Sequence, residues 1–340
     1  MAGDRHHILP RFLLKGFASR ISGKEVFTWA YRKDGTIFEP NTTKISVEKH
    51  FYGKEGEVSV DAEITDLEDE FANLLDELRA REEGIEITGL KIPEFIAHLC
   101  IRTKHLRDSF LESSEFLMDR ISEFLSDYNN IKKLLANNFN LEGFEKILED
   151  QQIPQPYRPL VRWFLQNMDS DFGQESILRI FFQTVTVELK KVTPKATKEG
   201  HIKAMAKNII PEVRTEDYRL LHWFICKSKT PLILGDSGCL FELVGPQRFK
   251  SINDKNDKIA NIFLPISSDR MLIGRAISSA PQVDSKAINE VIAKSSREYF
   301  VCSERSEEIA SLLALIATDS ELISKEDIEQ IVKGLLIKSN

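Results

Sequence analysis

The spacing of apolar residues changes twice along the chain, and this change constrains the fold more than any other feature. Between residues 20 and 60, short apolar runs alternate with turn residues, and the runs at 26–31 and 36–38 predict a β-hairpin. Residues 61–214 place apolar side chains every three or four positions, which is typical of amphipathic helices. Residues 215–303 return to short apolar runs bounded by turns, which predict further strands.

These patterns predict an α+β fold that is predominantly helical. We expect a central helical bundle and a mixed or antiparallel sheet that combines the N-terminal hairpin with the C-terminal strands. The expected organisation is a single α+β domain over residues 1–303, followed by a C-terminal helical pair over residues 304–340. Within the domain we expect an N-terminal arm and hairpin at 1–60, a helical bundle at 61–214 and a strand-rich part at 215–303.

Individual elements follow from the same spacing and from turn residues. Asp61 is the expected N-cap of the first long helix, Gly84 its stop, and Pro93 a first-turn residue of the second. The expected helices are 61–83, 93–110 with a continuation to 125, 141–148, 157–166, 176–190, 198–210, 286–296, 304–317 and 325–337. The expected strands are 220–226 and 231–234, joined by a tight turn, and 262–264, 271–277 and 299–302.

Composition limits the class of protein. A chain of 340 residues with 42% hydrophobic and 29% charged residues has the composition of a folded globular protein. The four cysteines are far apart and form no Cys-x-x-Cys pair, so we expect reduced thiols rather than a zinc or redox motif. No signal-peptide pattern and no apolar run of about 18 residues occurs, so we expect a cytoplasmic protein without a membrane partner.

The charge distribution bears on the expected partners. A net charge of −7 argues against a protein that coats nucleic acid nonspecifically, because such binding needs many Lys and Arg contacts with phosphate. A local groove for a nucleic acid or nucleotide stays open, because residues 188–214 are rich in lysine; solvated helix faces explain the same pattern. The apolar spacing of residues 312–316 and 328–335 fits either core packing or an oligomer contact through the C-terminal helices.

Two adjacent histidines, His6 and His7, stand near the N-terminus. Such residues serve as metal ligands, as proton carriers or as partners of buried polar groups. The apolar residues that follow, among them Pro10, Phe12 and Phe17, would anchor a segment that otherwise frays. Both a chemical and a structural role for the histidines are therefore open.

His98, Arg102 and His105 follow one another at steps of four and three. On a continuous helix this spacing places them within an arc of about 60° at one edge of the apolar face. An arginine between two histidines suits an anionic group such as a phosphate, because the guanidinium presents a fixed fork of donors. The competing interpretation is a solvated helix edge.

Asp236 lies in Leu-Gly-Asp-Ser-Gly at the end of an apolar strand. A carboxylate at such a position is held by turn amides and can bind a metal, orient a histidine or act as a base, or it can simply form the turn. The chain has no nucleophile elbow, P-loop, dinucleotide-binding loop, His-Glu-x-x-His or EF-hand pattern. Most standard enzyme classes therefore lose support.

Several of these pieces together resemble an uncharacterised bacterial family, a domain of unknown function. Its members open with His-[His/Tyr]-x-x-Pro-[Arg/Gln]-[Phe/Tyr]-x-Leu-[Lys/Arg]-x-Phe, which this chain matches over residues 6–17. The resemblance spans roughly residues 5–303. It continues through Trp29, Tyr31, Phe51, Tyr52, Glu68, Arg102, Thr103, Asp236, residues 263–266, Ile288 and Asn289.

The resemblance implies a shared polar group of residues rather than a known activity. In the late turn the family usually has Ser-Asp-Asn-Pro, whereas this chain has Gly-Asp-Ser-Gly at 235–238, so only the aspartate is carried over. The residues implied are His6, His7, Glu68, Arg102, Asp236 and Asn289.

Two functional hypotheses follow. The first is a hydrolase that acts on phosphodiesters of nucleic acids or nucleotides, with a role in bacterial defence or toxicity. In this hypothesis His6, His7, Glu68 and Asp236 are catalytic, and Arg102, His98, His105 and Asn289 bind the substrate. A divalent metal would be held by His7 and Asp236. The second hypothesis is a noncatalytic binding or regulatory module, in which the same residues form a buried hydrogen-bonded cluster that docks the N-terminal arm.

Overall fold

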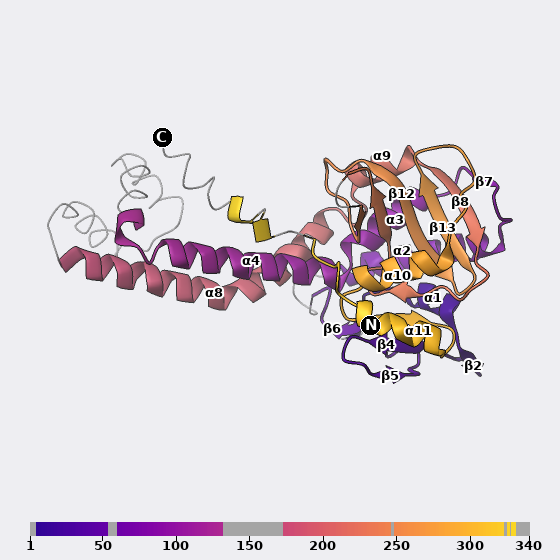
Figure 1. The fold of residues 1–340 in the computed structure, drawn as a ribbon, viewed down its shortest axis with the longest axis horizontal. Coiled ribbons are helices and arrows are strands. Elements are labelled where there is room, and N and C mark those ends of the chain that lie inside the picture. Colours follow the sequence, from indigo (N-terminus) through magenta and orange to yellow (C-terminus); the bar gives the residue numbers. More distant parts are fainter. Residues whose placement is uncertain are drawn as a thin grey trace. The chain divides into compact units, whose positions relative to one another are not determined.

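The computed structural model describes residues 5–53, 60–131, 173–245, 248–322, 325–326 and 328–330 (Figure 1). The helices expected at 141–148 and 157–166, and most of the one expected at 325–337, lie outside these residues. The chain divides into two compact units, each described by itself. Unit 1 comprises Met1–Ser109 and Lys198–Leu322, and unit 2 comprises Phe110–Thr197 and Ile323–Asn340. The described residues form helices and sheets, so the α+β class is confirmed.

A four-stranded antiparallel sheet in unit 1 joins the two ends of the chain. Its order is β5 (Ile37–Phe38), β4 (Trp29–Arg32), β14 (Tyr299–Cys302) and β9 (Leu234–Gly235). The β4–β5 hairpin turns at Gly35, whose φ of 86° favours glycine. The expected sheet of the N-terminal hairpin and C-terminal strands is therefore confirmed.

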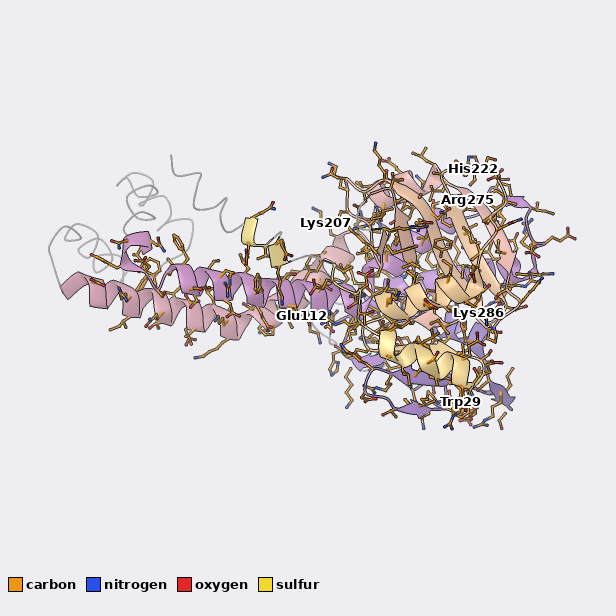
Figure 2. All side chains as sticks on the ribbon, viewed as in Figure 1. Trp29, Glu112, Lys207, His222, Arg275 and Lys286 are labelled. Carbon is orange, nitrogen blue, oxygen red and sulfur yellow. The ribbon has the colours of Figure 1, made fainter. Side chains whose placement is uncertain are left out.

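A second, six-stranded sheet contains the remaining C-terminal strands. Its order is β11 (Phe249–Lys250), β10 (Leu240–Leu243), β12 (Ile259–Ser267), β13 (Arg270–Arg275), β8 (His222–Lys227) and β7 (Glu86–Ile87), all antiparallel. Figure 2 labels Arg275 and His222, which pair across β13 and β8. The tight turn that we expected between 220–226 and 231–234 is wrong, because β8 and β9 belong to different sheets. The intervening residues Leu232 and Ile233 are fully buried, so the connection runs through the core.

Helices cover both faces of the six-stranded sheet. Phe263 of β12 shares a cavity with Ile288 of α10 (Ser285–Ser295), which places α10 on one face. The neighbouring residue Ile262 points to the opposite face and pairs with Phe241, whose ring packs against Tyr218 of α9 (Glu212–Arg219). Coverage on both faces explains why consecutive residues of the central strands are buried rather than every second one.

The N-terminal segment is tied to the core by short elements. β1 (Arg5–His7) pairs with β6 (Val47–Lys49), and the two form a ribbon that we call the β1–β6 ribbon. β2 (Arg20–Ser22) pairs with β3 (Glu25–Phe27). Between them, α1 (Arg11–Leu14) and η1 (Lys15–Phe17) bury apolar side chains, so the expected anchoring of this segment agrees with the structure. The fully buried ones are Leu9, Leu13, Leu14 and Phe17.

The helix expected at 61–83 is present as α2 (Asp61–Ala80), with Val60 rather than Asp61 as its N-cap. Two other helical regions differ from the sequence prediction. The long helix after Pro93 is two helices, α3 (Ile92–Ile101) and α4 (Lys104–Phe124). Thr103 separates them, because its hydroxyl accepts a hydrogen bond from the Leu106 amide at 3.2 Å and so caps α4. Conversely, the helices expected at 176–190 and 198–210 form one helix, α8 (Gly173–Lys207), which continues through Pro194.

The boundary expected after residue 303 does not separate the following residues from the main core. α11 (Glu307–Ser311) and η3 (Leu312–Leu315) belong to unit 1. Their side chains Ile309 and Leu312 are buried with the residues of both sheets. η3 also contacts α10.

Candidate functional site

Arg102, the residue after α3, is the centre of a buried polar cluster. Its side chain is 1% exposed, and all three of its nitrogens are engaged. Nε donates to the Tyr52 hydroxyl at 2.8 Å, and Nη1 donates to His98 Nε2 at 3.2 Å. Nη2 donates to the His7 carbonyl at 2.7 Å and to Glu68 Oε1 at 2.8 Å. We call His6, His7, Tyr52, Glu68, His98 and Arg102 the Arg102 cluster.

The buried histidines of this cluster are neutral acceptors. Because Arg102 can only donate, His98 Nε2 must be unprotonated, and Nδ1–H then donates to the Ile209 carbonyl at 3.0 Å. Burial, and secondly the Arg102 charge, lowers the pKa of His98 to about 3. His6 Nδ1 accepts from the Tyr52 amide at 2.9 Å, and its ring stacks on that of Tyr52. Both rings therefore fix backbone positions instead of facing a substrate.

His7 and Glu68 form the more exposed side of the cluster. His7 Nε2 donates to the Thr42 carbonyl at 3.3 Å, and burial lowers the pKa of the ring. The Glu68 side chain is 30% exposed and uses Oε1 for its bond with Arg102. Since the Tyr52 hydroxyl also donates to the His7 carbonyl at 2.8 Å, the cluster clamps the end of β1 to α2 and α3.

His105 and Asn289 do not join this cluster. With the helix broken at Thr103, His105 faces Ser251 and the Ser320 carbonyl, so the continuous arc that we expected is wrong for this residue. The Asn289 amide spans the backbone before β9, accepting from the Ile233 amide and donating to the Pro231 carbonyl. Both side chains are almost completely buried and hold separate chain segments together.

Asp236 lies after β9 and binds the start of β14. Oδ1 accepts from the Arg297 amide at 2.8 Å, and Oδ2 accepts from the amides of Glu298 at 2.6 Å and Tyr299 at 3.2 Å. No hydrogen bond among the described residues joins this carboxylate to the Arg102 cluster. Burial raises the pKa of Asp236 to about 6, against the opposing effect of the three amides.

This raised pKa gives a measurable pH dependence. The folded protein binds the Asp236 proton more tightly than the unfolded chain does. The contribution of Asp236 to the free energy of unfolding therefore falls as pH rises from about 4 to 6. The difference in unfolding free energy between wild type and Asp236→Asn should fall by about 1 kcal/mol between pH 5 and pH 7. Urea denaturation at both pH values measures it, with Asp69→Asn on the exposed face of α2 as control. An unchanged difference would contradict the raised pKa.

A second buried arginine, which the sequence analysis missed, lies one turn further along the chain. Arg107 Nε donates to His201 Nδ1 at 3.0 Å, and Nη2 donates to the Phe51 carbonyl at 2.6 Å. The guanidinium also lies 3.5 Å above the Phe51 ring centroid. His201 Nε2 donates to the Ile101 carbonyl, and burial with the Arg107 charge lowers the pKa of His201 to about 4. This pair repeats the chemistry of Arg102 and His98.

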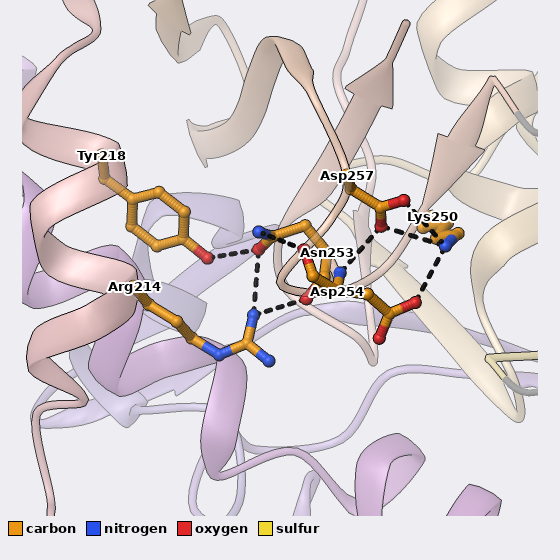
Figure 3. Close-up of polar contacts among 6 residues, drawn as sticks. All are labelled: Arg214, Tyr218, Lys250, Asn253, Asp254 and Asp257. Atoms are coloured by element: carbon orange, nitrogen blue, oxygen red, sulfur yellow. Dashed lines mark hydrogen bonds and ion pairs between the residues drawn. The ribbon is translucent and has the colours of Figure 1, made fainter. Parts of the chain in front are cut away.

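A third polar group, also missed, surrounds the loop after β11 (Figure 3). Arg214 Nη1 and the Tyr218 hydroxyl both donate to Asn253 Oδ1, at 2.9 and 2.6 Å. Lys250 Nζ donates to Asp254 and Asp257, each at 3.0 Å. The Lys250 charge is paired with two carboxylates and Arg214 is bound to Asn253, so this group fixes the loop and has a structural role. Its members lie in a stretch that shows neither periodicity nor a motif.

A cavity of about 220 Å³ lies beside the β1–β6 ribbon. Ile8, Val47 and Glu48 of the ribbon region line one side of it, and Lys104 and Asp108 of α4 line another. Its other lining residues are Arg32, Phe38, Lys44, Ile45, Ser46, His105, Asp236, Arg297, Glu298 and Tyr299. Among the expected site residues only Asp236 and His105 line it. The expected site residues are therefore divided: one group lies in the buried Arg102 cluster, and Asp236 and His105 line the cavity.

Comparison with known proteins identifies the family of this chain. The family model described as "Protein of unknown function (DUF4238)" matches residues 5–331. The chain belongs to this family. No curated protein and no solved structure matches the chain.

Two glycines stand on either side of Asp236 in the late turn of this DUF4238 chain. A Cβ on Gly235 would lie 2.4 Å from Ser296 Oγ, so a larger residue at this position would require that side chain to move. Gly238 has φ +75°, which favours glycine and which proline cannot adopt. From this turn Asp236 binds the start of β14.

Two findings on the described part of this DUF4238 chain concern the expected metal and the membrane. Among the described residues no group of three or more His, Cys, Asp or Glu side chains could hold a metal ion. His7 and Asp236, the expected ligands, bind separate backbone segments. Within the same residues, no helix has the length and apolar character that crossing a membrane requires.

Proposed function

We propose that this chain is a noncatalytic ligand-binding module whose site is the cavity beside the β1–β6 ribbon. One observation supports this proposal above all. His98 uses both of its ring nitrogens for bonds within the protein, and Arg102 uses all three of its guanidinium nitrogens. Asn289 likewise uses both atoms of its side-chain amide. Because these groups are engaged in holding the protein's own chain, they have little capacity left to move a proton or to bind a substrate. They position the walls of the cavity instead.

The link between cluster and cavity is the β1–β6 ribbon. Arg102 and Tyr52 both bind the His7 carbonyl, and the next residue, Ile8, lines the cavity. His6 pairs with Glu48, which also lines it. The cluster therefore holds one wall of the binding site in a fixed position, which favours tight binding because little ordering is required.

Ligand retention by the full chain tests this proposal. The purified protein is equilibrated with mixtures of amino acids, nucleotides, sugar phosphates and polyamines, and bound compounds are identified by native mass spectrometry. We expect a compound to be recovered chemically unchanged, and its occupancy to fall at least tenfold in Lys104→Met or in Asp108→Asn but not in Lys24→Gln. Conversion of the compound, or wild-type occupancy in both cavity variants, would overturn the proposal. Far-UV circular dichroism checks that all three variants are folded.

Hydrolysis of phosphodiesters in nucleic acids or nucleotides is our second proposal, with a cytoplasmic role in bacterial defence. The observation that favours it is Asp236, a carboxylate with a pKa of about 6 in a cavity that also contains Lys104 and Arg297. Incubation with RNA, DNA and nucleotides in the presence of several divalent metals tests it. Turnover that is lost in Asp236→Asn would support hydrolysis, and absence of turnover would remove it.

A further inference from the structure

The cavity beside the β1–β6 ribbon is lined by equal numbers of opposite charges. Its cations are Arg32, Lys44, Lys104 and Arg297, and its carboxylates are Glu48, Asp108, Asp236 and Glu298. Two of these carboxylates are already satisfied by the protein. Lys104 Nζ donates to Glu298 at 2.5 Å, and Asp236 accepts from three amides. The remaining charges decide what the cavity can bind.

Asp108 and Glu48 are the carboxylates that lack hydrogen bonds. Asp108 is 23% exposed and lies 3.7 Å from Lys104 Nζ and 3.6 Å from Arg297 Nε, but accepts no hydrogen bond from a described residue. Glu48 lies 3.7 Å from Arg107 Nη1 and likewise accepts none. Arg107 Nη1 is itself buried without a hydrogen-bond partner among the described residues. Burial raises the pKa of Asp108, against the opposing effect of the Lys104 and Arg297 charges.

Lys44 and Arg32 are the cations with the fewest contacts to other described residues, and both are exposed to solvent. Lys44 is exposed and forms no ion pair with a described residue. The Arg32 side chain is 48% exposed, and its Nε lies 3.7 Å from Asp34 in the hairpin turn. The lining therefore mixes two carboxylates that lack hydrogen bonds from described residues with two cations, Arg32 and Lys44, that have few contacts with described residues.

The size of the cavity limits the ligand. A volume of about 220 Å³ is below the roughly 300–1,000 Å³ of pockets for drug-sized ligands, so the cavity suits a small metabolite. An anion alone would meet four carboxylates, and a cation alone would meet Lys104 and Arg297. A molecule with both charges can contact carboxylates and cations at once, because an ammonium group supplies three donors and a carboxylate accepts from guanidinium and ammonium groups.

We infer that the cavity binds a small zwitterion with the chemistry of a free amino acid, its ammonium group between Asp108 and Glu48 and its carboxylate at Arg32 and Lys44. This inference rests on the proposed binding function and names the ligand class for the same site. The apolar side chains of Ile8 and Ile45 contact the carbon chain that joins the two charges.

Isothermal titration calorimetry on the full chain tests the inference with matched compounds. 4-Aminobutyrate, β-alanine and the common α-amino acids are compared with butylamine and butyrate at constant ionic strength. We expect at least one amino acid to bind at least tenfold more tightly than either singly charged compound. Asp108→Asn and Arg32→Gln should each weaken that binding at least tenfold, whereas Asp69→Asn and Lys24→Gln should leave it unchanged.

The outcomes separate this inference from the proposed function. Butylamine or butyrate binding as tightly as the best amino acid, or wild-type affinity in Asp108→Asn, would overturn the zwitterion. Retention of a phosphate compound that depends on Lys104, without amino acid binding, would overturn the zwitterion and keep the binding function. No binding by any compound in either experiment would overturn both. Asp108→Asn is isosteric but removes the negative charge beside Lys104 and Arg297, so its melting temperature without ligand checks that it folds.

Discussion

Arg102→Met is expected to lower the free energy of unfolding by about 3–5 kcal/mol, the cost of removing one partner from a buried charged network. Methionine fills a similar volume but donates no hydrogen bond. The His7 carbonyl, His98 Nε2 and Glu68 Oε1 would each lose the bond that Arg102 supplies. Urea denaturation at pH 7 measures the change.

The matched control for this prediction is Arg219→Met. The Arg219 side chain is 47% exposed, and its ion pairs with Glu94 and Glu212 lie at the surface, so its loss should cost about 1 kcal/mol or less. Limited proteolysis adds a second measurement, since release of the β1–β6 ribbon in Arg102→Met should expose the chain near Pro10. A stability within 1 kcal/mol of wild type would contradict the structural role of Arg102. It would instead favour a substrate-binding role.

Acidification from pH 7 to pH 5 is expected to cost about 4 kcal/mol of stability through His98 and His201 together. Both histidines have a folded-state pKa below the unfolded value of 6.5, at about 3 and about 4. Below pH 6.5 the unfolded chain therefore binds protons that these two histidines do not bind in the folded protein. Their contribution to the free energy of unfolding is fully present above that pH and is lost as the pH falls.

Variants assign this slope to the two histidines. His98→Gln and His201→Gln should each remove about half of the pH dependence between pH 7 and pH 5, because glutamine is uncharged throughout. Each variant also keeps a donor and an acceptor for the bonds to backbone and arginine. Lys24→Gln, on the exposed surface, should retain the wild-type slope. If both histidine variants had the same change of unfolding free energy with pH as wild type, the two buried imidazoles would not be neutral as inferred.

Local patterns in the sequence predict the elements better than their partners. The spacing of apolar residues predicts α2, α10 and the β4–β5 hairpin because these elements depend on neighbouring residues. It does not predict that β14 pairs with β4, or that β8 and β9 enter different sheets, since these contacts join distant segments. Thr103 shows how one hydroxyl overrides a helical pattern.

The candidate site was predictable where it depends on side chains of recognisable type. His98 and Arg102, four residues apart, do meet, and the family resemblance also pointed to Glu68 and His7. Arg107 was missed because its partners, the Phe51 carbonyl and a histidine 94 residues away, leave no local signal. Asp236 was predicted as a carboxylate held by amides, but the amides belong to the start of β14 rather than to its own turn.

The pairing of β4 with β14 has a consequence for synthesis. Thr28 Oγ1 donates to the Cys302 carbonyl, and these residues are 274 positions apart. At about 5–20 residues per second, a ribosome needs roughly 14–55 s to make the second strand after the first. During that interval the edge of the hairpin is unpaired and open to other chains. We therefore expect the nascent chain to benefit from cover of β4 by the ribosome surface or by a chaperone until β14 emerges.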